Sequence, residues 1–567
     1  MFERTGAGCY ARGMKRSLVC ALPLALLACG EESLDPVTTT TTGSGGGSTT
    51  GTGGGGGMTP DPSVICAELG LAIEPRASGP FGTTRGELAE NFELPLLGGQ
   101  TFVFDERYSG CETYVFIPDT LTVSATDMTS VWEKDLSRLL DASPRNAHYF
   151  FFSRRASDEA ASESLSAMAA RIDAELAARS PEDAEHFRAR LHVVAARAQS
   201  LEGWIGDALN GHGRVGMGID RFQRIRGAGT LADVKRYSSA LASQGHWPWR
   251  SNLAYVAHEA TFFNAQFERL SNLEDRTVVT LFAGEELDEF ADVNVTLPRG
   301  TEMAEFDTFE IAIEMACPDP TQPELGNCGA WDYLAHLFVM DGLGQPVELG
   351  RFITTYHRES QWIVDATPML PHLLAGGARD FRWSFAPPWN PQPTKTKLSL
   401  LFSNQGKGIK PRAALPLFAG GDFNSSYNVG RADAAVAVPA SAAKVELYAL
   451  TTGHGAATGQ CAEFCNHQHE FVVGGAVHLQ QFEIAGVQDG CMAEVERGMT
   501  PNQGGTWWFG RGGWCPGQQV EPWRVDVTSD VTPGTDAIVS YRGLLNGAEP
   551  PDDAGNIVLA SYLVIYE

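Results

Sequence analysis

The feature that most constrains the fold of this 567-residue chain is a change in hydrophobic periodicity near residue 275. Beyond it, apolar side chains recur at every second position, as at Phe309, Ile311 and Ile313 and again from residue 557 to 566. Gly and Pro separate these short runs, which is typical of antiparallel β-sandwiches and jelly rolls. The sequence therefore predicts two jelly rolls side by side, over residues 275–425 and 426–567, with a ligand groove between them.

Residues 61–270 follow a different pattern, in which short apolar runs alternate with amphipathic helices. Apolar residues recur at helical spacing, for example at Leu165, Met168 and Ile172. The order strand, helix, strand, helix favours a partly parallel α/β layer fold. The strands are expected at residues 92–97, 101–104, 114–117 and 149–152.

This α/β region also resembles a known type of domain. Phe92-Glu93-Leu94-Pro95 before a Gly-Gly turn, then a buried strand and a long helix, resembles the thioredoxin-like domains of exported bacterial proteins. The resemblance extends over about residues 85–265. A redox Cys-x-x-Cys would follow the strand at 114–117, and the sequence has none there. We therefore expect an α/β domain without thiol chemistry.

Residues 1–29 have the composition of an export signal. Lys15 and Arg16 precede an apolar run over residues 18–28 that is too short to span a bilayer as a folded helix, and Met14 is the expected start. The run ends in Leu26-Leu27-Ala28-Cys29, which resembles the lipobox of bacterial lipoproteins. That resemblance makes Cys29 the acylated first residue of the mature protein. An ordinary secretory signal cut nearby is the alternative, and either signal exports the chain.

Residues 30–60 follow as a tether. Its central part, residues 37–58, is almost entirely Thr, Gly and Ser, which bury no apolar surface and remain flexible. Behind an acylated Cys29, such a tether predicts a lipid-anchored protein of the bacterial cell envelope, in the outer membrane or at the cell surface. The formal charge of −27 argues against nucleic acid as a partner, because binding it requires a basic stripe.

The cysteines indicate a disulfide framework. Of eleven, Cys9, Cys20 and Cys29 belong to the leader, and an even number remains in an exported chain. Sequence alone does not fix the pairs. Their order along the chain suggests Cys66–Cys111, Cys317–Cys328, Cys461–Cys465 and Cys491–Cys515.

Three of these cysteine clusters hold residues suited to acid–base chemistry. Glu463 lies inside the five-residue ring 461–465, which would hold its carboxylate firmly. Trp331-Asp332 follows the cluster of Cys317 and Cys328. Arg511 lies in a Gly-rich run before Trp514-Cys515. A positioned, partly desolvated carboxylate beside aromatic side chains is what general acid–base catalysis requires.

These motifs resemble, in order and spacing, those of the F-type peptide-N-glycosidases, which are secreted bacterial amidases made of two adjacent eight-stranded jelly rolls. The matching runs are Trp331-Asp332, 348–356, 461–465 and 513–517, and the resemblance covers about residues 280–567. It implies hydrolysis of the amide bond between asparagine and N-acetylglucosamine in N-glycoproteins, which leaves aspartate in the peptide. It implies no metal and no other cofactor.

The resemblance also implies a role for each motif residue. Asp332 takes the place of the catalytic aspartate, and would be the base that activates water. Glu463 takes the place of a glutamate that supports catalysis and contacts the glycan core. Although tryptophans are core residues by default, those in a groove suit sugar stacking. The expected substrate-binding side chains are Trp331, Trp389, Arg511 and Trp514.

Two departures from the family leave a second class of function open. The strand in which the family places a third carboxylate is 381–389 here and contains no acid, and Tyr333 replaces an arginine. A non-enzymatic glycan-binding protein or adhesin on the same scaffold is therefore the alternative. A copper-dependent oxidase is more remote, because His467 and His469 share a strand face but no further ligand cluster accompanies them.

Overall fold

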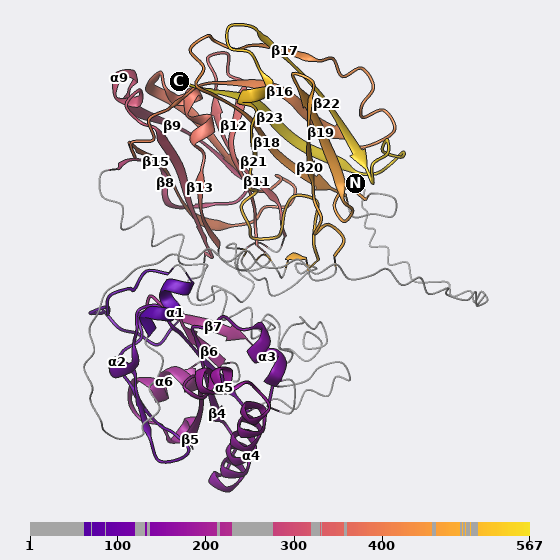
Figure 1. Cartoon of the computed structure of the whole chain (residues 1–567). Coiled ribbons are helices and arrows are strands. Elements are labelled where there is room, and N and C mark those ends of the chain that lie inside the picture. Colours follow the sequence, from indigo (N-terminus) through magenta and orange to yellow (C-terminus); the bar gives the residue numbers. More distant parts are fainter. Residues whose placement is uncertain are drawn as a thin grey trace, which may run out of the picture. The chain divides into compact units, whose positions relative to one another are not determined.

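The computed structural model describes residues 62–69, 71–84, 87–119, 131–132, 136–211, 216–229, 276–318, 329, 331–355, 360–455, 461–487, 490–491, 494, 499 and 509–567 (Figure 1). The predicted signal, Cys29 and the tether lie outside these residues. Within the described part of the chain, no helix combines the length and the apolar character needed to cross a membrane.

The N-terminal region is a mixed α/β layer, as its sequence pattern predicted. Its main sheet has the strand order β5-β4-β3-β6-β7, in which β3, β4 and β5 are parallel and β6 and β7 antiparallel to their neighbours. The elements are α1 (Pro62–Glu68), β1 (Glu93–Pro95), β2 (Thr101–Val103), α2 (Phe104–Arg107), β3 (Thr113–Pro118), α3 (Leu136–Ala142), β4 (Ala147–Ser153), α4 (Asp158–Ala177), α5 (Pro181–Arg188), β5 (Leu191–Arg197), η1 (Ala198–Ser200), α6 (Gly203–Gly211), β6 (Gly216–Ile219) and β7 (Ile225–Gly229).

Both faces of this sheet are covered, which explains why its strands are continuously apolar. Val115 of β3 packs in one core with Leu165 and Met168 of α4. Phe116, the next residue of β3, packs on the opposite face with Phe92 and Ile205. The α4 helix begins where the Ser157 hydroxyl accepts a hydrogen bond from the Ala160 amide.

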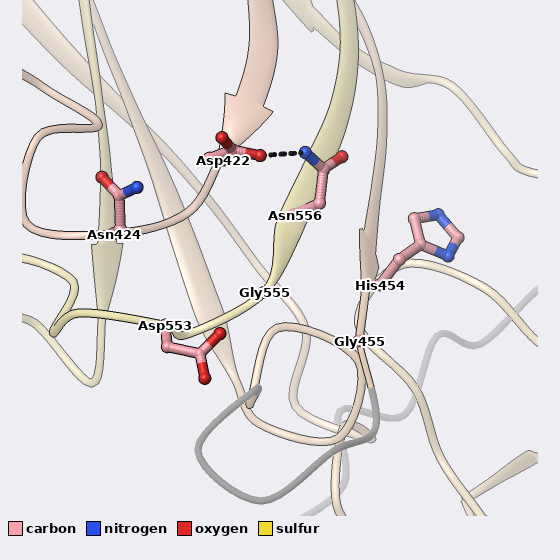
Figure 2. A pocket seen from close by; sticks show the side chains of 7 residues that line it. All are labelled: Asp422, Asn424, His454, Gly455, Asp553, Gly555 and Asn556. Atoms are coloured by element: carbon pink, nitrogen blue, oxygen red, sulfur yellow. Dashed lines mark hydrogen bonds between the residues drawn. The ribbon is translucent and has the colours of Figure 1, made fainter.

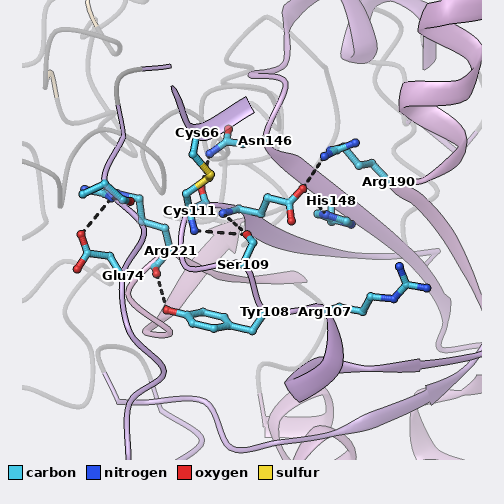
Figure 3. The surroundings of a disulfide bond; sticks show 12 residues. Cys66, Glu74, Arg107, Tyr108, Ser109, Cys111, Asn146, His148, Arg190 and Arg221 are labelled. Carbon is cyan, nitrogen blue, oxygen red and sulfur yellow. Dashed lines mark hydrogen bonds and ion pairs between the residues drawn. A yellow bond between two sulfur atoms is a disulfide. The ribbon is translucent and has the colours of Figure 1, made fainter. Parts of the chain in front are cut away.

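A disulfide and a buried ion pair fix the start of β3 (Figure 3). Cys66 of α1 is bonded to Cys111. The neighbouring Glu112 accepts from the Arg190 guanidinium at 2.6 Å and lies 3.1 Å from Nε2 of His148. Burial opposes the charge of Glu112, but His148 and Arg190 outweigh it and lower the Glu112 pKa to about 2. This cluster is compact and polar, and it ties three segments of the α/β region together.

The described residues after 275 form two antiparallel β-sandwiches. In the first, the sheet β13-β10-β15-β8 packs on the sheet β12-β11-β14-β9. Its elements are β8 (Thr277–Leu287), β9 (Phe290–Arg299), α9 (Gly300–Met303), β10 (Thr308–Ala316), β11 (Leu334–Met340), β12 (Pro346–Ile353), β13 (Ser360–Asp365), η4 (Thr367–Leu373), β14 (Gly376–Ser384) and β15 (Thr394–Ser403).

The second sandwich pairs the sheet β16-β23-β18-β21 with the sheet β17-β22-β19-β20. Its elements are β16 (Pro411–Asp422), β17 (Ala434–Ala437), β18 (Lys444–His454), β19 (His467–Val473), β20 (Ala476–Gln481), β21 (Trp523–Asp526), η6 (Thr528–Asp530), β22 (Asp536–Leu545) and β23 (Asn556–Tyr566). Because β16 pairs with β23, the chain enters the second sandwich before residue 411, whereas the sequence placed the change at 425.

The strand β18 departs from the period-two pattern, and its position explains why. Every residue from Val445 to Gly453 is buried. Val445 and Leu447 face the core of the second sandwich, whereas Tyr448 and Leu450 pack into the core of the first. The sheet that contains β18 is therefore covered on both faces, and the two sandwiches share a continuous apolar contact.

Arg351 of β12 joins the two sandwiches inside this contact. Its side chain is fully buried and donates in a bidentate arrangement to Glu348, with N···O distances of 2.8 and 2.7 Å. The same guanidinium donates to the carbonyl oxygen of Val558 at 2.7 Å and to the Thr452 hydroxyl at 3.1 Å, both in the second sandwich. Because this guanidinium bonds to both sandwiches, it fixes the position of one sandwich relative to the other.

Candidate functional site

The structure brings the two predicted catalytic carboxylates to one arginine. Asp332 precedes β11 of the first sandwich, and Glu463 lies between β18 and β19 of the second. Arg511 lies between them, with its guanidinium 3.6 Å from the Asp332 carboxylate and 3.3 Å from that of Glu463. Asp332, which precedes the other two residues by more than 100 positions, thus forms one charged cluster with them.

Arg511 is held rigidly in this cluster. Its side chain is only 1% exposed, and Nη1 donates to the carbonyl oxygen of Phe509 at 2.9 Å. The guanidinium lies 4.7 Å from the ring centroid of Trp514 and 5.2 Å from that of Phe464. Aromatic faces attract a cation where water is scarce, so the positive charge keeps a fixed position between the two carboxylates.

The backbone around Asp332 is fixed by Thr354. The Thr354 hydroxyl donates to the carbonyl oxygen of Trp331 at 2.7 Å and accepts from the amide of Tyr333 at 2.8 Å. From the other side, the Gln392 side chain accepts from the amide of Trp331 at 3.2 Å. Thr354 and Gln392 therefore fix the backbone on both sides of Asp332. No sequence pattern identifies Thr354 or Gln392, because their partners are backbone atoms of a distant loop.

Glu463 is fixed by the ring that contains it. Cys461 and Cys465 are disulfide-bonded, and the amide of Cys465 donates to the carbonyl oxygen of Cys461 at 2.7 Å. The Glu463 carbonyl accepts from the amide of Gly512 at 2.7 Å, and its carboxylate accepts from the amide of Gly455 at 3.3 Å. Both ends of this residue are therefore held, and its carboxylate is aimed at Arg511.

The electrostatics of the cluster favour a proton on Glu463. Burial raises the Glu463 pKa, Arg511 lowers it and the nearby Asp332 raises it, and the balance lies above the ordinary value. One guanidinium facing two carboxylates neutralises one charge and leaves the other uncompensated, so a proton is retained more readily. Such a pair can supply a base and an acid in the same site.

An exposed aromatic surface lies next to Asp332. Trp331 and Trp389 are 54% and 78% exposed, which is unusual for large aromatic side chains. The Tyr333 ring lies between them, 6.4 Å from Trp331 and 6.2 Å from Trp389, and its hydroxyl accepts from Asn390 at 2.6 Å. By contrast, Trp514 is 5% exposed and donates to the carbonyl oxygen of Gly453. The buried Trp514 therefore supports Arg511, whose guanidinium it contacts.

A polar hollow of about 470 Å³ lies beside the Glu463 ring (Figure 2). His454 and Gly455 form part of its wall, and Gly455 is the residue whose amide reaches Glu463. The His454 ring stacks on Trp514 at 5.3 Å, and burial, aided by Arg351, lowers its pKa to about 3. The remaining lining residues are Asp422, Asn424, Asp553, Gly555 and Asn556.

The two histidines considered for metal binding lie in the interior of the second sandwich. His467 Nδ1 lies 2.6 Å from His469 Nε2, and His469 Nδ1 lies 2.7 Å from the Tyr541 hydroxyl. Burial lowers the pKa of both histidines, that of His467 to about 3. His467 Nδ1 and both ring nitrogens of His469 are engaged within this group, and the described residues contain no cluster of three or more potential metal ligands.

The described chain also contains the Cys491–Cys515 disulfide, which closes the loop that carries Arg511. Cys317 is disulfide-bonded as well. Its predicted partner Cys328 lies outside the described residues.

The chain is similar to known proteins over its C-terminal half. The family model described as "Peptide-N-glycosidase F, C terminal" matches residues 422–564. Among curated proteins, peptide-N(4)-(N-acetyl-beta-D-glucosaminyl)asparagine amidase F of Elizabethkingia miricola is 24% identical over 302 residues, which are 49% of this chain and 79% of that protein. The resemblance to the F-type peptide-N-glycosidases that the motifs indicated is thereby confirmed.

Solved structures with similar backbones include two of peptide-N-glycosidase F. A recombinant peptide:N-glycanase F is 19% identical, with a TM-score of 0.40, and the match covers 52% of this chain and 96% of that one. The glycosylasparaginase from Flavobacterium meningosepticum is 20% identical, with a TM-score of 0.39 and the same coverage.

Proposed function

We propose that the C-terminal half of this chain is an amidase that releases N-linked glycans from glycoproteins by cutting the bond between asparagine and N-acetylglucosamine. The observation that carries the proposal is the meeting of Asp332 and Glu463, one from each sandwich, at the buried guanidinium of Arg511. The similarity to peptide-N-glycosidase F supports the same reaction class.

In this reaction, Asp332 removes a proton from a water molecule, and the water oxygen attacks the side-chain carbonyl carbon of the glycosylated asparagine. The positive charge of Arg511 stabilises the negative charge that develops on the carbonyl oxygen. The bond from that carbon to nitrogen then breaks, and the nitrogen leaves on the sugar as a glycosylamine. The peptide retains a carboxylate, so asparagine becomes aspartate.

Glu463 supplies the proton that the departing nitrogen needs. Burial and the nearby Asp332 raise the pKa of this carboxyl group, which suits it to donate a proton. Because the carboxylates belong to different sandwiches, the scissile bond would lie between the sandwiches, where both can reach it. The reaction needs no metal or cofactor, since the attacking water and both proton transfers are provided by side chains.

The exposed surface of Trp331 and Trp389 favours one alternative. Sugar rings stack on such aromatic faces, so this surface would bind a glycan whether or not the amide is cut. The family's third carboxylate is absent from residues 381–389, and Tyr333 replaces an arginine. A protein that binds N-glycans without cleaving them, as an adhesin would, is therefore the second candidate.

Site-directed variants separate the two functions. With an N-glycopeptide as substrate, Asp332→Asn should lower kcat about 10²–10⁴-fold, which is the usual contribution of a general base. Glu463→Gln should reduce the rate less, and partly through KM. The exposed Asp380, which accepts from Asn294, provides a control, and Asp380→Asn should leave release unchanged.

The product identifies the bond that is cut. The released peptide should carry aspartate in place of asparagine when analysed by mass spectrometry, and thermal melts should show that each variant folds. If the unmodified protein releases no glycan from any N-glycopeptide but still binds them, the enzyme proposal is wrong and the adhesin function replaces it.

We also propose that the chain is anchored to the bacterial envelope through an acylated Cys29 and that its α/β region is a thioredoxin-like domain without redox activity. The second proposal is supported by the mixed order of its sheet, in which β6 is antiparallel to β3. Cys29→Ser should abolish acylation and membrane association. Retention of both would exclude this anchor, and reduction of a test disulfide by the α/β region would exclude the non-redox assignment.

A further inference from the structure

A second cavity, of about 480 Å³, lies in the second sandwich on the side of its two edge strands. One wall is formed by the end of β20 and the residues after it, and the other by the segment 513–523 that leads into β21. β20 is the last strand of one sheet and β21 the last strand of the other, so the cavity lies at the open edge of the sandwich.

The polar part of this cavity consists mainly of glutamine amides. Gln480 is positioned by the Thr451 hydroxyl, which donates to its side-chain oxygen at 2.9 Å. The side-chain oxygen of Gln519 is buried and accepts no hydrogen bond within the described chain. Each amide offers both donors and an acceptor, and this is the combination that a row of sugar hydroxyl groups requires. The four glutamines are Gln480, Gln481, Gln518 and Gln519.

The rest of the lining excludes an anionic ligand and suits a sugar ring. Glu483, Glu494 and Glu521 line the cavity, and none of its described lining residues is a lysine or arginine. A negatively charged sugar would therefore be repelled, whereas a neutral one would not. The rings of Phe482 and Trp523 and the 48% exposed Leu479 provide apolar surface for the carbon face of a pyranose.

Trp514 connects this cavity to the candidate active site. Its ring lies 4.7 Å from the Arg511 guanidinium, and the same residue lines the cavity. A ligand in the cavity is thus separated from the Asp332, Arg511 and Glu463 cluster by little more than one side chain. A glycan that presents its reducing end at that cluster has further sugar units that must lie on a neighbouring surface.

We propose that this cavity binds outer, uncharged sugar units of the N-glycan whose reducing end lies at Asp332, an inference that rests on the proposed function. The other conceivable occupant is polypeptide, added as a strand to the edge of β20. Such a strand would bind backbone groups along the edge of the sheet, whereas this cavity is lined by four glutamines. The lining therefore favours sugar.

The test uses two glycopeptides with one peptide sequence, one carrying a full neutral glycan and the other trimmed to the two sugars nearest asparagine. Leu479→Arg fills the cavity with a long charged side chain. We expect it to raise KM about tenfold for the full glycan and to leave KM for the trimmed glycan and kcat for both unchanged. Val477→Arg is the matched control, because Val477 is 61% exposed on the same strand and does not line the cavity.

Two results would overturn the inference: no change with either substrate, or an equal change with both, which would make polypeptide the occupant. Failure of the proposed function is distinguishable, because then neither glycopeptide is cleaved by the unmodified protein. In that case, calorimetry with the same two glycopeptides decides. Weaker binding of only the full glycan to Leu479→Arg would support the cavity as a sugar site, and unchanged binding would exclude it.

Discussion

Replacing Arg511 by methionine should remove the one charge that holds the candidate site together. Methionine fills most of the same volume and keeps contact with Trp514, so the change acts mainly on charge. In Arg511→Met, Asp332 and Glu463 remain 14% and 15% exposed without the cation between them. Two partly buried carboxylates would then repel each other in a medium that screens them poorly.

The distances set the size of the effect. At 3.3 and 3.6 Å, each contact between guanidinium and carboxylate is worth about 5 kcal/mol of Coulomb energy at an effective dielectric constant of about 20, before desolvation is subtracted. Removing one partner of a buried ion pair has a net cost of about 3–5 kcal/mol. For a domain of the size of one sandwich, this loss of stability corresponds to a fall in Tm of roughly 6–20 °C.

The pH dependence gives a second signature. Without Arg511, the pKa of Glu463 should rise further, because the interaction that lowered it is gone. A carboxyl group whose pKa is higher in the folded than in the unfolded protein stabilises the fold below its unfolded-state pKa. This stabilisation is lost as the pH rises through its folded-state pKa. The deficit of Arg511→Met should therefore be larger at neutral pH than near the ordinary glutamate pKa. Adding Asp332→Asn removes one of the two charges and should restore about 1–3 kcal/mol of it.

Thermal melts of the single and double variants at the two pH values measure these effects, and the glycopeptide assay measures release. Arg524 provides the control, because it also joins an acid of each sandwich, Asp365 at 3.2 Å and Glu446 at 2.8 Å. Arg524→Met should lower stability without affecting release. If Arg511→Met is as stable as the unmodified protein at neutral pH, the buried charge cluster does not exist as described.

Two further perturbations test how the site is held. Thr354→Val removes the hydroxyl that fixes the backbone around Asp332, and it should lower kcat about 10–100-fold with little change in KM. Thr354→Ser keeps the hydroxyl and should retain activity. Equal kinetics for the valine and serine variants would contradict the positioning role. Burial opposes the charge of Glu348, but Arg351 and His336 lower its pKa to about 2. Glu348 should therefore contribute about 3 kcal/mol to the free energy of unfolding at pH values above its pKa in the unfolded chain, and this contribution should be lost as the pH falls toward 2. Denaturant unfolding of Glu348→Gln should accordingly show a weaker dependence on acid pH.

Local patterns in the sequence predicted which segments are helices and which are strands. The helical spacing of Leu165, Met168 and Ile172 predicted α4, and the alternation from Phe309 to Ile313 predicted β10. A period-two pattern does not describe β18, where Tyr448 and Leu450 are buried as well as Val445 and Leu447. Whether the second face of a strand is covered depends on a partner that is distant in sequence, and the strand's own residues do not name that partner.

The candidate site residues could be predicted from the sequence, because their types and their cysteine neighbours are local properties. The sequence placed Asp332 beside Trp331 and Glu463 inside a five-residue disulfide ring. Only the tertiary structure decided that these two carboxylates meet at Arg511, that Thr354 holds the first, and that Trp389 faces solvent. Those relations depend on how two sandwiches pack across the β18 sheet and the Arg351 contact, and packing of that kind is a property of surfaces assembled from the whole chain.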